Sequence, residues 1–160
     1  MEIKIFTTGG TIDKVYFDQL SEFQVGEPTV GDILREVRVG FAYQVETLLH
    51  KDSLDITEEE RRRIVEAVAT DPHQHVIITH GTDTMIETAL QLRGLPGKVI
   101  VLTGSMAPAR FRNTDAIFNV GYAMAAVQLL PEGVYIAMNG RVFNPARLRK
   151  NRQTQQFEEV

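Results

Sequence analysis

The chain has 160 residues, enough for one domain with a substantial core, and its 43% hydrophobic and 24% charged residues are ordinary for a globular protein. A net charge of −4 gives no broad attraction to nucleic acid or to an anionic membrane surface, so we expect neither as a partner. The absence of cysteine excludes disulfides, thiolate metal sites and cysteine nucleophiles, and it fits a cytoplasmic location.

The first third of the chain is predicted to contain a strand, a long loop, a helix and a second strand. The strand at residues 3–6 starts almost at once, so we expect no secretory signal before it. Residues 8–28 show no regular spacing of apolar residues that would indicate a helix or strand, so they are predicted to form a loop. A loop of that length in a compact domain is usually functional or mobile. Apolar spacing then indicates a short helix at 30–37, and alternation indicates a strand at 41–49.

Helices and strands alternate through the rest of the chain. Thr57 and Glu60 have the spacing of a capping box at the start of a helix. Further strands are predicted at 76–79, 99–102 and 134–138, and further helices at 84–93 and 115–130. Asn139-Gly140 predicts a tight turn into another short strand, whereas residues 144–160 are polar and follow no clear pattern. No apolar run approaches the ~20 residues of a membrane span.

This alternation of strands and helices predicts the fold class. Such sequences form parallel βαβ units with right-handed crossovers and with helices on both faces of the sheet. We therefore predict a single α/β domain, a three-layer sandwich with a mostly parallel, flavodoxin- or Rossmann-like sheet. Residues 1–150 are assigned to this domain and residues 151–160 to a C-terminal tail.

Two threonine-rich segments follow buried strands. Residues 7–12 read Thr-Thr-Gly-Gly-Thr-Ile, and residues 79–85 read Thr-His-Gly-Thr-Asp-Thr-Met. Because the carboxyl ends of parallel strands meet at one edge of a sheet, both segments are expected to border one pocket. Such a pocket would contain Thr11, Thr82 and Asp83, a set that suggests chemistry by a hydroxyl nucleophile.

Each segment also has a plainer interpretation. The first is not a typical phosphate-binding loop, since it has neither Gly-x-Gly-x-x-Gly nor Gly-Lys-Ser/Thr, but it can be a structural turn. Thr82 and Asp83 are residue types that cap helices. His80 is more often a packed residue than a catalytic one, and the remaining histidines show no metal-ligand spacing: His50, His73 and His75. Lys150 lies in a basic run and is either a surface residue or a base for a threonine hydroxyl.

The two segments together resemble the signatures of the bacterial-type L-asparaginases, a family of threonine amidohydrolases. Residues 8–12 correspond to the first signature, and residues 79–85 reproduce the second in full. The likeness extends over nearly the whole chain, through Leu-Thr-Gly-Ser-Met-x-Pro at 102–108, Asp115-x-x-x-Asn119, Met-Asn-Gly at 138–140 and Arg147-x-x-Lys150.

The resemblance implies a role for each matching residue. Thr11 would be the nucleophile that attacks the side-chain amide of L-asparagine, giving an acyl-threonine ester and then L-aspartate and ammonia. Thr82, Asp83 and Lys150 would form a second triad in which Lys150 draws the Thr82 proton and Asp83 either orients Lys150 or holds the substrate amine. Ser53 would hold the substrate α-carboxylate. Backbone N–H groups near Gly10 and Thr82 would form the oxyanion hole. The resemblance places these residues around the substrate: Gly10, Asp52, Ser53, Gly81, Thr82, Asp83, Ser105 and Met106. No metal or organic cofactor is implied.

The sequence departs from the family at three points. The family tyrosine near the nucleophile aligns with Phe23, and we assign its role to Tyr16, with an apolar lid of Tyr16 and Phe17 as the alternative. Leu54 stands where some members have a glutamine that contacts the substrate amine. Family members are about twice as long and carry a second domain, so we expect a short form with a more open site, weaker binding and weak glutaminase activity.

The short chain, about half the length of family members, also affects the expected oligomeric state and leaves other functions to consider. An uncovered sheet edge or helix face predicts a homo-oligomer, a dimer or tetramer, with residues 144–160 available to exchange with a partner. The competing functions are a related amidohydrolase for another small or tRNA-linked amide, a non-catalytic binding domain, and a fragment of a longer enzyme.

Overall fold

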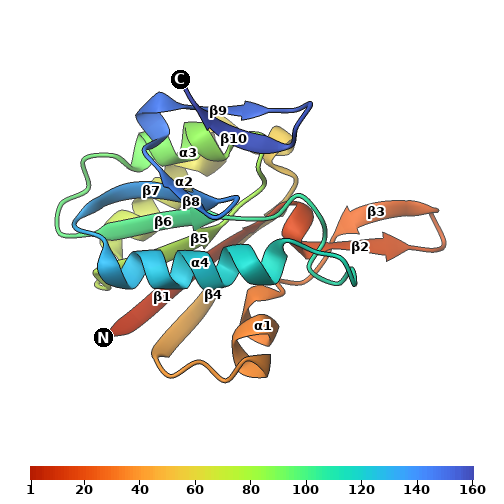
Figure 1. Ribbon diagram of the computed structural model, residues 1–160, viewed down its shortest axis with the longest axis horizontal. Helices are drawn as coiled ribbons and strands as arrows, with labels where there is room; N and C mark the ends of the chain where they lie inside the picture. Colours follow the sequence, from red (N-terminus) through yellow and green to blue (C-terminus); the bar gives the residue numbers. More distant parts are fainter.

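The computed structural model describes residues 1–160, in which a six-stranded sheet lies between two layers of helices (Figure 1). Across the sheet the strands are β4 (Ala42–Lys51), β1 (Glu2–Gly9), β5 (His75–Thr79), β6 (Val99–Thr103), β7 (Gly133–Met138) and β8 (Arg141–Phe143). All neighbouring pairs are parallel except β7 and β8. The predicted α/β class with a mostly parallel sheet is confirmed.

The central strands are apolar on both faces because helices cover both sides of the sheet. Ile5 of β1 and Ile77 of β5 point into one core cluster, whereas Phe6 and Ile78, their neighbours in sequence, point into the other. This alternation explains why the strands appear in the sequence as continuous apolar runs.

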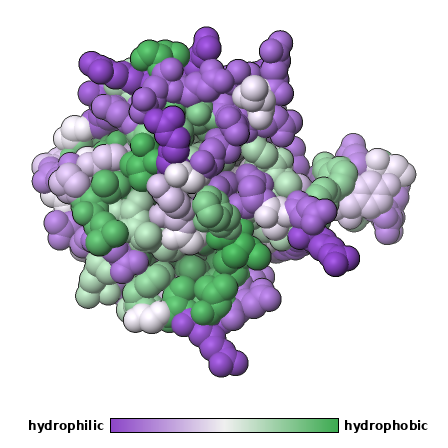
Figure 2. Space-filling model, in the orientation of Figure 1, coloured by the Kyte–Doolittle hydropathy of each residue, from purple (hydrophilic) through white to green (hydrophobic).

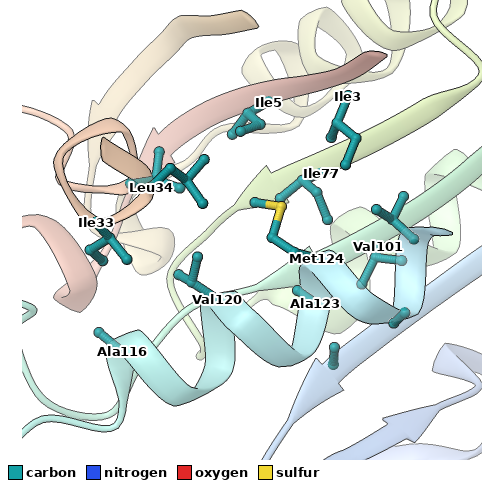
Figure 3. Close-up of a cluster of buried hydrophobic side chains, with 14 of the residues drawn as sticks. Ile3, Ile5, Ile33, Leu34, Ile77, Val101, Ala116, Val120, Ala123 and Met124 are labelled. Carbon is teal, nitrogen blue, oxygen red and sulfur yellow. The ribbon is translucent and has the colours of Figure 1, made fainter. Parts of the chain in front are cut away.

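Helices α1 (Val30–Glu36) and α4 (Ala116–Leu129) cover one face, and α2 (Glu58–Thr70) and α3 (Met85–Leu92) cover the other (Figure 1). Figure 3 shows side chains of α4 and α1 meeting those of the strands in the first of these layers. The predicted capping box of α2 is present, with Thr57 Oγ1 accepting from the Glu60 N–H and Glu60 accepting from the Thr57 N–H. None of the helices combines the length and the apolar character needed to cross a bilayer.

The order of the strands creates a crevice beside β1. The chain passes from β1 to β4 on one side and then returns to β5 on the other side of β1. Connections after β1 and β5 therefore diverge, and in parallel sheets ligands bind at this point, outside the carboxyl ends of the strands. The two threonine-rich segments begin in the last residues of these two strands and continue beyond them, at the edge of the sheet that the sequence predicts.

The predicted loop at residues 8–28 contains regular structure that its sequence pattern does not reveal. A single 3₁₀ turn, η1 (Thr11–Asp13), leads into an antiparallel hairpin of β2 (Lys14–Phe17) and β3 (Glu22–Val25), which projects from the body of the molecule (Figure 1). Each strand has four residues and none of its side chains is buried, so no buried face imposes a periodic pattern.

Residues near the C-terminus form a second hairpin. A 3₁₀ turn, η3 (Pro145–Arg147), is followed by β9 (Leu148–Asn151), which pairs with β10 (Gln156–Glu159). Leu148 and Phe157 join the core cluster on the α2 and α3 side of the sheet. The residues that we assigned to a tail, 151–160, thus include a strand that packs on this chain's own core.

Candidate functional site

A cavity of about 270 Å³ lies at the carboxyl end of the sheet. Its walls come from the segments after β1, β5 and β6 and from the β9–β10 hairpin: Thr11, Thr82, Asp83, Met106, Lys150, Arg152 and Gln155. Four residues predicted from the sequence to be catalytic, Thr11, Thr82, Asp83 and Lys150, are therefore brought together.

Glycine allows the two threonine-rich segments to touch. The Gly10 backbone has φ of +88°, which favours glycine, and its N–H donates to the Lys51 carbonyl at 2.9 Å. A Cβ atom added to Gly10 would lie 2.5 Å from the Gly81 backbone. This close approach sets Thr11, the first residue of η1, beside the segment that carries Thr82.

Lys150 connects the C-terminal hairpin to the second threonine segment. Its Nζ donates to Thr82 Oγ1 at 2.7 Å and to Asp83 Oδ1 at 2.9 Å. The guanidinium of Arg152 lies 3.6 Å from the same Asp83 oxygen. The cavity wall therefore carries two basic side chains, Lys150 and Arg152, each within ion-pairing distance of the Asp83 carboxylate.

His80, next to this triad, is fully buried and does not line the cavity. Its Nδ1 lies 2.7 Å from the Gly81 carbonyl oxygen, and its Nε2 lies 2.8 Å from Thr88 Oγ1. Burial lowers the pKa of His80 from 6.5 to about 4, so the ring is neutral near neutral pH. The histidine thus acts as a hydrogen-bonded core residue, in agreement with the plainer interpretation of the sequence.

Ser53 and Asp52 belong to the segment after β4 and do not line the cavity. Ser53 begins the 3₁₀ turn η2 (Ser53–Asp55), and its buried Oγ accepts from the Thr84 N–H at 3.2 Å. Asp52 caps that turn and forms an ion pair with Lys14 at 3.0 Å. Burial alone would raise the pKa of Asp52, but hydrogen bonds from Lys14 and the Leu54 N–H hold it below its usual value. Both residues support the loop behind Gly81, whose added Cβ would lie 2.7 Å from Ser53 Cβ.

The segment after β6 supplies the remaining wall. The Asp115 carboxylate accepts from the Met106 N–H at 2.9 Å and from the Ala107 N–H at 3.0 Å, which fixes this loop. Met106 Sδ lies 3.8 Å from Thr82 Oγ1 and borders the cavity. The hydroxyl of Ser105, which we predict to contact substrate, donates to the Ala107 carbonyl.

Tyr16 lies on β2 and is not part of the cavity wall. It pairs across the hairpin with Phe23, the alternative residue for the family tyrosine, at 5.4 Å between ring centroids. Phe23 in turn contacts Phe111, with 5.6 Å between centroids. The two aligned candidates are therefore cross-strand neighbours on the projecting hairpin.

Several site residues were missed from the sequence. Arg152 and Gln155 could not be placed because the hairpin that presents them was not recognised. Arg61, a buried arginine that donates to Thr88 Oγ1 at 3.0 Å, had a detectable signal. It lies three residues before Ile64 on the apolar stripe of α2, where a charged side chain needs a buried partner.

No group of three histidine or carboxylate side chains is arranged to hold a metal ion.

Comparisons with known proteins agree with these motifs. A family model described as "Asparaginase, N-terminal" matches residues 2–159. The L-asparaginase of Thermococcus kodakarensis is 30% identical over 159 residues, which cover 94% of this chain and 48% of that protein. L-asparaginase 2-3 of Saccharomyces cerevisiae is 32% identical over 154 residues, covering 88% and 42%.

Solved structures show the same likeness in three dimensions. The thermostable L-asparaginase of T. kodakarensis superposes with a TM-score of 0.85 at 28% identity, covering all of this chain and 51% of that one. L-asparaginase I of Vibrio cholerae gives a TM-score of 0.82 at 26% identity, covering 99% and 51%. The chain spans about half the length of these relatives. With both signature segments, the strand order and the family match in agreement, this chain belongs to the asparaginase family and corresponds to its N-terminal part.

Proposed function

We propose that this chain hydrolyses the side-chain amide of L-asparagine to L-aspartate and ammonia through an ester on Thr11. The observation that carries the proposal is the contact of Lys150 with Thr82 and Asp83 in the cavity that Thr11 also lines. A threonine hydroxyl is a poor nucleophile near neutral pH and needs a base within reach. A site that only binds ligands has no need of a lysine held 2.7 Å from a hydroxyl.

The proposed reaction has two steps of the same kind. Thr11 Oγ1 attacks the amide carbon, forming a C–O bond and a tetrahedral oxyanion, while its proton passes by way of Thr82 to the amine of Lys150. The C–N bond then breaks, and Lys150 returns the proton to the departing nitrogen, which leaves as ammonia. Water attacks the ester in the same manner, releasing L-aspartate and restoring the Thr11 hydroxyl. With asparagine and water as the only reactants, the atoms and protons of the two steps balance.

Stabilisation of the oxyanion is assigned to the backbone N–H of Thr82, since the Gly10 N–H donates to the Lys51 carbonyl. The Thr82 N–H makes no hydrogen bond to another group of the protein, although Thr82 itself is buried at the cavity wall. A donor of this kind contributes roughly 3 kcal/mol to the transition state where water is excluded. Asp83, which already pairs with Lys150, is proposed to pair with the substrate α-amine as well.

The size of the cavity supports a small substrate, and the residues of its walls support an open site. Sites for drug-sized ligands measure about 300–1,000 Å³, and this cavity, at about 270 Å³, lies below that range. Since Ser53 and Tyr16 lie outside its walls, we propose weaker substrate binding and a high KM for asparagine. Glutamine differs by one methylene, a discrimination of about 1–3 kcal/mol, so weak glutaminase activity is part of the proposal. A micromolar KM for asparagine would contradict the open site.

A homo-oligomer is supported by the outer face of α4. The helix contains no charged residue, and Ile117, Phe118 and Leu129 on it are exposed. Figure 2 shows hydrophobic residues gathered over this side of the molecule. An apolar groove of about 320 Å³ between α1 and α4 adjoins them. Sedimentation of the wild type and of Ile117→Glu tests this, because the charge should dissociate a dimer or tetramer.

Ammonia release from L-asparagine by the wild type, by Thr11→Ala and by Thr70→Ala tests the main proposal. Thr70 is an exposed residue at the end of α2, so its replacement is a matched control. We expect equal amounts of ammonia and L-aspartate from the wild type and the control and none from Thr11→Ala. Activity that survives Thr11→Ala would overturn the nucleophile. A wild type that binds L-aspartate without releasing ammonia from asparagine would favour a binding domain.

A further inference from the structure

A chain of buried hydrogen bonds ends at the carbonyl oxygen before Thr82. The Gly81 carbonyl can only accept, so the proton of neutral His80 must be on Nδ1, 2.7 Å away. His80 Nε2 then has no proton and accepts from the Thr88 hydroxyl at 2.8 Å. Thr88 Oγ1 accepts in turn from Arg61 Nε–H at 3.0 Å. In each of these hydrogen bonds, the neighbouring groups therefore determine which atom donates and which accepts.

The alternative direction for the Thr88 hydroxyl is weak. It could donate to the Thr84 carbonyl, but that oxygen is 3.5 Å away. Arg61 also lowers the pKa of His80, after burial as the larger cause, which disfavours a second ring proton. The ring is thus held as one tautomer in one orientation.

The backbone around His80 has little freedom. Its N–H donates to the Thr103 carbonyl of β6 at 2.9 Å. A Cβ atom added to Gly104 would lie 2.3 Å from the His80 carbonyl oxygen, so the two segments pack backbone against backbone. The imidazole is therefore a rigid part of the core and not a mobile side chain.

We propose that His80 is a positioning residue, which orients the peptide between Gly81 and Thr82 so that the Thr82 N–H faces the substrate carbonyl oxygen. In a trans peptide the C=O and N–H groups point in opposite directions. A carbonyl held against the buried ring therefore turns the Thr82 N–H away from the core, on the side where Thr82 lines the cavity. Thr88 and Arg61 act through His80 by fixing its tautomer and ring plane. The inference rests on the function proposed above.

The first test compares Thr88→Val with Thr88→Ser. Valine keeps the shape of threonine but removes the hydroxyl, and serine restores it. Because a misaimed oxyanion donor weakens only the transition state, we expect Thr88→Val to lower kcat about 10-fold or more. KM and the affinity for L-aspartate should stay within about twofold of wild type, since these report ground-state binding. Thr88→Ser should recover most of kcat, and Thr70→Val on the exposed end of α2 should change neither constant.

A purely structural role would lower the melting temperature of Thr88→Val without this separation of kcat from KM, and an unchanged kcat would overturn the proposal. Thr88→Ala, also paired with Thr88→Ser, replaces the valine variant if that protein does not fold. The wild-type rate and its loss in Thr11→Ala report separately on the proposed function. Inactivity of the wild type would overturn both.

A second measurement does not depend on activity. Nitrogen-15 NMR of the wild-type imidazoles should show one histidine that keeps a proton on Nδ1 and none on Nε2 as the pH falls from 8 to 5. Thr88→Val should shift the unprotonated Nε2 resonance of that ring, because it loses its donor. A His80 ring protonated on Nε2 instead would contradict the hydrogen-bond chain and with it the proposal.

Discussion

Lys150 lies directly opposite Phe157 in the antiparallel pair of β9 and β10. Opposite residues in such a pair project from the same face of the ribbon. Phe157 is buried in the core beside Phe143, whereas the Lys150 ammonium reaches Thr82 at the cavity. One cross-strand position therefore connects the hydrophobic core to the proposed base, and the hairpin presents the lysine only while the phenylalanine remains packed.

Replacing Phe157 with alanine should destabilise the protein and lower its activity. Truncation of a buried phenylalanine costs about 3–5 kcal/mol, and here it also releases the strand that carries Lys150. Denaturant unfolding with an ammonia assay on the folded fraction measures both effects. Val160→Ala, at an exposed position beside the hairpin, should be nearly neutral. A Phe157→Ala protein of wild-type stability would mean that the hairpin is not part of the core.

Lys150→Met should lower kcat by about 10²- to 10⁴-fold, the usual contribution of a positioned acid or base. The methionine keeps the length of the side chain but cannot exchange a proton with Thr82 or pair with Asp83. Steady-state kinetics with L-asparagine measure the loss. Lys14→Met is the matched control, because Lys14 pairs with Asp52 outside the cavity. Equal losses in the two variants would argue against a proton-transfer role for Lys150.

Gly81→Ala and Gly121→Ala should have effects of opposite sign on stability. A Cβ on Gly81 would meet Ser53 Cβ at 2.7 Å, so we expect a cost of roughly 1–3 kcal/mol and a displaced Thr82 with lower kcat. Gly121 lies in α4 with nothing within 4 Å of its Cβ position, so alanine there should stabilise the protein by about 1 kcal/mol. Thermal unfolding distinguishes the two, and a neutral Gly81→Ala would contradict the close packing.

Stability should fall as the pH decreases from about 6.5 to 4, partly because of His80. Burial lowers the folded-state pKa of His80 to about 4, whereas the unfolded chain takes up the proton near 6.5. Within this range the unfolded state binds more protons, so acid favours unfolding, by roughly 3 kcal/mol over the whole interval.

Urea unfolding of the wild type and of His80→Gln at several pH values measures this contribution, which should be absent from the variant. His73→Gln is a control of opposite sign, because a hydrogen bond to Asp71 raises the pKa of His73 and stabilises the folded state at low pH. Parallel pH profiles for the wild type and His80→Gln would contradict the assignment.

The positions of Thr11 and Thr82 could be predicted because parallel strands bring their carboxyl ends to one edge, and each threonine follows a strand that is visible in the sequence. The positions of Arg152 and Gln155 could not, because they lie in the β9–β10 hairpin, whose short strands pair through backbone groups and leave little apolar periodicity. The sequence also could not predict that the Ser53 side chain points into the protein interior. Its hydroxyl accepts from the Thr84 N–H, and this contact joins two segments that are far apart in the sequence.

The Lys150–Thr82 contact joins residues 68 positions apart, and the cavity draws its walls from four separate segments. Contacts between such distant parts of a chain carry a large loop-closure entropy and form late in folding. Enzymatic competence should consequently lag behind the recovery of helical circular dichroism when the denatured chain is refolded. Catalysis would then serve as a reporter of the last stage of assembly.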